Sequence, residues 1–157
     1  MTSFSFEMTQ TAIIRTKLLT LSGALPFLGA LALPFFPLAP FDAAHIASTY
    51  AALIIAFLSG TQWGLFLVVS GTSPVNLMIQ SNLVTLAAWA GLLLLPATGT
   101  LVLDALCFAY LLFLDYRLFK SGILPLWYFS LRRLVTLIVV GALLALTGIL
   151  SHSNPSL

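Results

Sequence analysis

Long apolar stretches, separated by short polar or proline-rich segments, make up most of the chain. The clearest runs from Tyr50 to Val69, which is long enough to cross a bilayer, since a spanning helix needs about 20 mainly apolar residues. Small residues recur on it at every fourth position, as Ala52, Ala56, Gly60 and Gly64. Because small side chains let helices approach closely in lipid, this spacing predicts the central helix against which the others pack.

The same pattern predicts five membrane-spanning helices joined by short turns. Their expected bounds are residues 18–39, 47–69, 75–95, 100–119 and 131–150. We therefore expect an all-α membrane protein, with a single five-helix transmembrane domain over residues 18–150 and tails at 1–17 and 151–157. The alternative for the first segment is a signal peptide with Ala30-Leu31-Ala32 as its cleavage site, but the apolar run is longer than the typical core of such a peptide.

Basic residues predict the orientation of these helices. All six fall in two clusters, Arg15 with Lys17 and then Arg117, Lys120, Arg132 and Arg133. Four predicted helices lie between the clusters, so both clusters reach the same side of the membrane. Because short loops rich in Lys and Arg stay in the cytoplasm, we expect a cytoplasmic N-terminus and an outside C-terminus. The expected location is the inner membrane of a bacterium, or of a mitochondrion for a eukaryotic chain.

Composition agrees with a membrane protein and narrows its partners. The chain is 61% hydrophobic and 6% charged, too little charge for the surface of a water-soluble domain. We expect the lipid bilayer, and other membrane proteins or a second copy, as partners, but no nucleic acid. Two histidines and the single cysteine, Cys107, give no metal-ligand spacing. The sequence contains no cofactor-binding motif and no catalytic motif. We therefore expect no cofactor, and the sequence favours a protein that is not an enzyme.

A cluster of polar residues is expected at one depth in the inner half of the bundle: Gln62, Trp63, Asn82, Asp115 and Arg132. An ionisable group inside a span costs about 2.5–3.5 kcal/mol, so it normally has a partner. We expect Asp115 to pair with Arg132 rather than Arg133, because Arg132 shares a helix face with Thr136. The alternatives for Asp115 are a proton- or ligand-binding carboxylate and an interfacial side chain.

A second aspartate, Asp104, lies three helical turns before Asp115 and on the same face. Because it falls within the first turn of the expected fourth helix, we expect it at the outer interface, with His45 as its candidate partner. Trp63 lies deeper than interfacial aromatic residues usually do, so its indole N–H is expected to have a partner inside the bundle.

Several segments resemble the DUF3429 family of small integral membrane proteins, which includes the mitochondrial transmembrane protein 69. The matching segments are Gly23-Ala24-Leu25-Pro26-Phe27, Phe57-Leu58-Ser59-Gly60 with Trp63-Gly64, Ser81 with Trp89, Asp115, and Leu124-Pro125 with Trp127-Tyr128, Leu131-Arg132 and Thr136. The likeness covers roughly residues 18–145 and departs from the family pattern at Ser59 and Gln62. It implies the fold and a retained first helix, and it implies no reaction.

Two hypotheses of function follow from these observations. The first is a non-enzymatic inner-membrane protein that assists or stabilises a membrane complex through helix packing, using the small residues of the second helix and a second small face with Gly141 and Ala145. The alternative is a binder or carrier of a small apolar molecule, lipid, quinone or proton, using the inner polar cluster.

Overall fold

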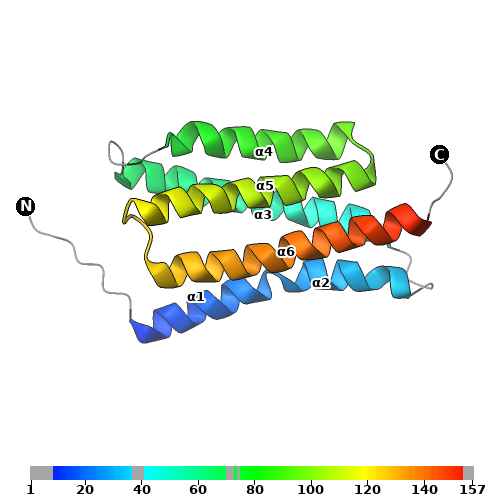
Figure 1. The fold of residues 1–157 in the computed structure, drawn as a ribbon, viewed down its shortest axis with the longest axis horizontal. Coiled ribbons are helices and arrows are strands. Elements are labelled where there is room, and N and C mark those ends of the chain that lie inside the picture. The colour runs from blue at the N-terminus through cyan, green and yellow to red at the C-terminus, as the bar shows by residue number, and fades with distance from the viewer. Residues whose placement is uncertain (1–8, 37–40, 70–72, 74, 154–157) are drawn as a thin grey trace, which may run out of the picture.

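The computed structural model describes residues 9–36, 41–69, 73 and 75–153, and every regular element in these ranges is a helix. Figure 1 shows the helices lying side by side along one long axis. The elements are α1 (Gln10–Ser22), α2 (Leu25–Ala32), the 3-10 turn η1 (Leu33–Phe35), α3 (Ala43–Val69), α4 (Leu77–Leu94), α5 (Ala97–Lys120) and α6 (Leu126–Ser153).

These elements form five helices long and apolar enough to cross a membrane, as the sequence predicts. The first is the continuous stretch Gln10–Phe35, made of α1, α2 and η1, and the other four are α3 to α6. Over the described residues, the all-helical class and the number of helices able to span a membrane are therefore confirmed. The side on which each terminus lies stays a prediction.

Several helices begin earlier than expected, and a polar side chain caps the earlier start of α1 and of α3. α1 begins at Gln10, inside the expected tail, and the Thr9 hydroxyl accepts a hydrogen bond from the backbone N–H of Ala12. Asp42 caps α3 in the same way, so this helix begins at Ala43. α6 begins at Leu126, five residues before the expected start at residue 131, and it continues to Ser153.

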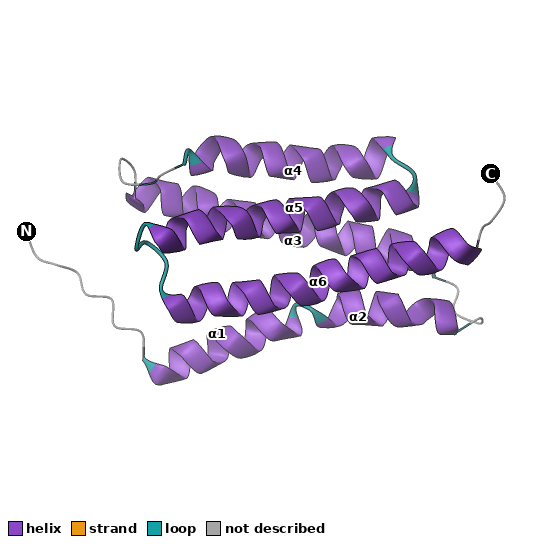
Figure 2. Cartoon of the chain, in the orientation of Figure 1, coloured by secondary structure: helices purple, strands orange, loops and turns teal. Residues whose placement is uncertain are grey.

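The first span bends between α1 and α2 (Figure 2). Pro26 has no N–H to continue the α-helical ladder, and a proline inside a helix breaks or kinks it. The carbonyl of Gly23, at the bend, accepts a hydrogen bond of 3.1 Å from the Tyr50 hydroxyl of α3. A side chain of the neighbouring helix thus satisfies a backbone group at the bend.

The most buried helix is α5 rather than α3, which corrects the expected centre of the bundle. In the most hydrophobic 18-residue stretch of each helix, 44% of the residues of α5 are buried, against 22% for α3. α5 packs against α3, α4 and α6. Its buried face includes Leu101, Leu111, Leu114 and Leu118, whose large side chains fill the centre of the bundle.

The small-residue stripe on α3 lies on the outer surface, so its expected role in packing this bundle is wrong. Gly60 and Gly64 are exposed, Ala56 is exposed, and Ala52 is only partly buried; a Cβ atom added at Gly60 or Gly64 would meet no heavy atom within 4 Å. The packed face of α3 lies beside the stripe and carries Ala44, Ala47, Ser48, Ala51 and Ile55. Small side chains do pack here, but on a different face of the same helix.

The second small-residue face behaves in the same way. Gly141 and Ala145 of α6 are exposed, and no heavy atom lies within 4 Å of a Cβ added at Gly141. Among the described glycines, Gly91 of α4 lies against a neighbouring helix, and a Cβ added there would lie 2.7 Å from a methyl group of Leu103. The Thr100 hydroxyl also donates a hydrogen bond of 3.1 Å to the Gly91 carbonyl. Close approach of two helices therefore occurs between α4 and α5.

Candidate functional site

A buried ion pair joins α5 to α6 at the end of the bundle where the two helices are connected. The Nε atom of Arg132 lies 2.9 Å from Oδ2 of Asp115, and both residues are 5% exposed. Arg133, the next residue, is exposed. The prediction that Asp115 pairs with Arg132 rather than Arg133 is therefore confirmed.

The loop between α5 and α6 places these two residues opposite each other. α5 ends in a Schellman motif, in which the N–H of Ile123 donates to the Leu118 carbonyl and the N–H of Gly122 donates to the Phe119 carbonyl, each at 3.0 Å. Gly122 has a φ of 73°, a left-handed conformation that glycine adopts without strain. The chain then reverses within a few residues, and α6 packs antiparallel to α5.

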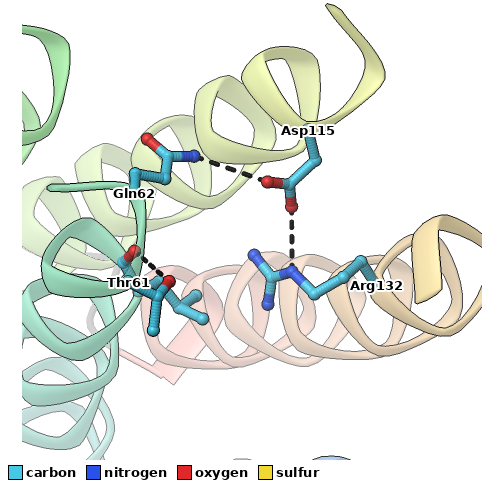
Figure 3. A network of polar contacts seen from close by, with 5 residues as sticks. Thr61, Gln62, Asp115 and Arg132 are labelled. Atoms are coloured by element: carbon cyan, nitrogen blue, oxygen red, sulfur yellow. Dashed lines mark hydrogen bonds and ion pairs between the residues drawn. The ribbon is translucent and has the colours of Figure 1, made fainter. Parts of the chain in front are cut away.

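Gln62 of α3 completes the polar network. Its Nε2 atom donates a long hydrogen bond of 3.4 Å to Oδ1 of Asp115, and Figure 3 shows the three side chains converging from three helices. Among the described residues, the Gln62 Oε1 atom and the Thr136 hydroxyl are buried without a hydrogen-bond partner. The network thus retains unused donors and acceptors.

Two members of the expected polar cluster lie elsewhere. Trp63 is 41% exposed on the outer surface of α3, so the expected partner for its indole inside the bundle is wrong. Asn82 is also exposed, and its amide donates to the Met78 carbonyl of its own helix at 2.7 Å. Both residues lie on α3 and α4 faces that point away from Asp115, because depth in the membrane does not determine the direction of a side chain around its helix.

Asp104 also departs from the prediction. It is fully buried on α5, and neither carboxylate oxygen has a hydrogen-bond partner within the described part of the chain. His45 is exposed, so the expected pair does not form. Asp42, three residues before His45, caps α3 by accepting hydrogen bonds from the backbone N–H groups of Ala44 and His45.

A cavity of about 330 Å³ lies beside the ion pair, at the small end of the range typical of ligand pockets. It is lined by the bent first span, α3 and α6, with one residue from α5. The lining residues are Thr16, Leu19, Thr20, Gly23, Phe27, Ile54, Phe57, Leu58, Thr61, Phe108, Tyr128, Arg132, Val135, Thr136 and Val139. Of these, the sequence had pointed only to Arg132 as a site residue.

The cavity is polar at one end and apolar at the other. Along α6 its lining changes from Tyr128, Arg132 and Thr136 to the apolar Val139. The first span changes in the same direction, from Thr16 and Thr20 to Phe27. The spacing of Thr16 and Thr20 puts them on one face of α1, a signal in the sequence that marks the polar part of this wall.

The guanidinium of Arg132 reaches the cavity with donors to spare. Only its Nε–H is bonded to Asp115, and across the described residues its two terminal nitrogens have no hydrogen-bond partner. Figure 3 shows these nitrogens on the side of Thr61, which also lines the cavity. Arginine has five N–H donors and no acceptor, so this group favours a ligand with an acceptor oxygen.

These features define a multi-pass helical membrane protein with a partly polar internal cavity. The chain belongs to the DUF3429 family, described as a protein of unknown function, whose family model matches residues 13–148. Comparison with curated proteins and with solved structures gave no match.

Proposed function

We propose that this protein binds a small amphipathic molecule in the cavity between the first span, α3 and α6. The observation that carries the proposal is a buried arginine with free donors at the polar end of an otherwise apolar cavity. A helix-packing role alone gives no reason to place unused donors beside a cavity in lipid, where an unsatisfied polar group costs free energy.

The lining supports one orientation of the ligand. Its polar head lies against Arg132, Thr136 and Tyr128, and its apolar body lies along Phe27, Phe108 and Val139. Because lipophilic contact gives little net driving force inside a bilayer, the hydrogen bonds at the head are the main source of selectivity. The protein then acts as a binder or carrier rather than as an enzyme.

Photolabelling in bilayer nanodiscs tests this function. The probes are single-chain molecules with a diazirine on the chain, used as the methyl ester and as the free acid. At least one of the two should label cavity residues such as Phe27 and Val139 more than the exposed Leu134 and Leu137 of α6. Labelling spread equally over both sets would contradict the proposal.

A matched pair of variants sharpens the test. Thr20→Phe places a ring in the cavity, whereas Leu18→Phe changes a residue that is 63% exposed on the same helix. We expect Thr20→Phe to reduce labelling of Val139 several-fold and Leu18→Phe to leave it unchanged. Equal labelling in the two variants would show that the probe reaches Val139 by another route.

The helix-packing function is a second candidate, favoured by a separate observation. Gly60, Gly64 and Gly141 lie on the surface with open space around them, which fits close approach by a helix of another protein or a second copy. Gly60→Leu should then leave the unfolding free energy of the monomer unchanged and weaken association, measured by crosslinking in native membranes. Unchanged association would remove this candidate.

A further inference from the structure

We propose that the head of the bound molecule is a neutral group with an acceptor oxygen, such as an ester or ketone carbonyl, and not an anion. The inference rests on the proposed function. It follows from the charges around the cavity, the donors that point into it, and its opening toward lipid.

Charge balance gives the first argument. Among the described residues that line the cavity, Arg132 is the one with a charged side chain, and Asp115 already lies 2.9 Å from it. The other basic residues of this end are exposed, and Arg117 and Lys120 lie over the rings of Phe113 and Tyr116. An anionic head would therefore add an uncompensated negative charge in a medium of low dielectric constant, which is costly.

Hydrogen bonding gives the second argument. Arg132 lines the cavity, and its two terminal nitrogens are donors only, without a partner among the residues described. The Thr136 hydroxyl oxygen, one helical turn further along α6, is covered by neighbouring atoms, so Arg132 supplies the hydrogen bonds to the head. A carbonyl oxygen accepts two hydrogen bonds through its two lone pairs, so one neutral carbonyl can accept from both terminal nitrogens.

The opening of the cavity gives the source of the molecule. Leu19 of α1 and Phe57 of α3 line the cavity, yet they are 74% and 68% exposed. α1 packs mainly against α6, so the cavity opens between α1 and α3 through apolar side chains. Apolar side chains at the opening of a membrane-spanning helix bundle face lipid, and the ligand therefore enters from the bilayer.

The two photoprobes described above also test the head group. At about pH 9 the free acid is ionised, because this pH is far above the pKa of a carboxylic acid, whereas the methyl ester is neutral. We expect the ester to label Val139 at least about tenfold more efficiently than the acid in the unchanged protein. In Asp115→Asn, which leaves Arg132 without a counter-charge, the preference should shift toward the acid.

The outcomes separate the inference from the proposed function. Equal labelling by both probes, or preference for the acid, in the unchanged protein overturns the neutral head and leaves the binding function in place. Failure of both probes to label the cavity overturns the function itself. If Asp115→Asn does not fold, the ester-to-acid ratio of the unchanged protein still decides the question. Arg133→Gln, which changes an exposed charge, should keep the original preference.

Discussion

The two aspartates of α5 lie on one face of the same helix, three turns apart, in opposite surroundings. Asp115 is bonded to Arg132 and Gln62, at 2.9 Å and 3.4 Å. Asp104 is more deeply buried and has no partner in the described residues. At one end of α5 the buried carboxylate links three helices, whereas at the other end a buried carboxylate without a partner is expected to oppose folding.

The packing around the two residues differs as well. The end with Asp115 borders the cavity, through Arg132 and Thr136. Near the other end, α4 and α5 approach closely at Gly91, and the Thr100 hydroxyl of α5 donates a hydrogen bond to the Gly91 carbonyl of α4. One end is held by charge and hydrogen bonds beside an open volume, whereas the other is held by close packing. This comparison predicts different responses to substitution.

The largest effect is expected at the ion pair. Asp115→Asn and Arg132→Gln should each lower the unfolding free energy by about 3–5 kcal/mol, because each leaves one buried partner uncompensated. The double variant should recover part of this loss, as measured by reversible unfolding in mixed micelles. Arg133→Gln is the control and should change stability by less than about 0.5 kcal/mol. If the single variants kept the unfolding free energy of the unchanged protein, the contact between Asp115 and Arg132 would be no stronger than an exposed ion pair.

At Asp104, in contrast to the ion pair, we expect substitution to stabilise the protein. Asp104→Ala should raise the unfolding free energy by about 1–3 kcal/mol, the usual cost of a buried polar group without a partner. Asp104→Asn keeps a polar group of the same shape, so it should raise the unfolding free energy by less in the same assay. A loss of stability in Asp104→Ala would mean that this carboxylate stabilises the fold, and the contrast between the two aspartates would disappear.

The close approach at Gly91 predicts a smaller effect. Gly91→Ala should lower stability by about 1 kcal/mol, the small end of overpacking costs, because the group nearest the new methyl is the flexible side chain of Leu103. Gly60→Ala adds the same methyl group in open space and should be neutral. The two variants are compared by thermal unfolding in one detergent, where equal melting temperatures would count against close packing at Gly91.

The smallest effect is expected at Gln62. Gln62→Leu should lower stability by about 0.6 kcal/mol, the average for a hydrogen bond between membrane helices, because its bond to Asp115 is long. Ser59→Ala removes a buried hydroxyl that has no partner in the described residues and should cost nothing. If Gln62→Leu lowered stability more than Arg132→Gln, then Gln62, and not the arginine, would be the principal partner of Asp115.

The number of long apolar helices and the pairing of Asp115 could be predicted from the sequence, but the direction of each side chain around its helix could not. Hydrophobic run length and basic clusters predict five spans, and the short loop after α5 predicts the pairing of Asp115 with Arg132. α3, however, carries small residues on two neighbouring faces, one with Ala44, Ala47 and Ala51 and one with Gly60 and Gly64. In lipid both faces are compatible with an apolar environment, so spacing alone does not show which of them is packed.

The cavity and Asp104 were missed for related reasons. The cavity depends on the bend at Gly23 and on which side chains of three helices meet there, and neither follows from one helix at a time. Asp104 was expected at the interface because its helix was predicted to begin at residue 100. α5 begins at Ala97, which adds a turn before Asp104 and moves it deeper into the bundle.

The first half of the first span has a consequence for sequence tolerance. α1 contains no buried residue, so its stability comes from contact with lipid more than from contact with protein. Most exchanges among apolar residues at Ile14, Leu18 and Leu21 should therefore be accepted, although charged residues there should not. In a saturation mutagenesis profile, most positions of α1 would then accept any residue that is soluble in the bilayer. The cavity-lining Thr16 and Thr20 would be the exceptions, because their side-chain identity matters.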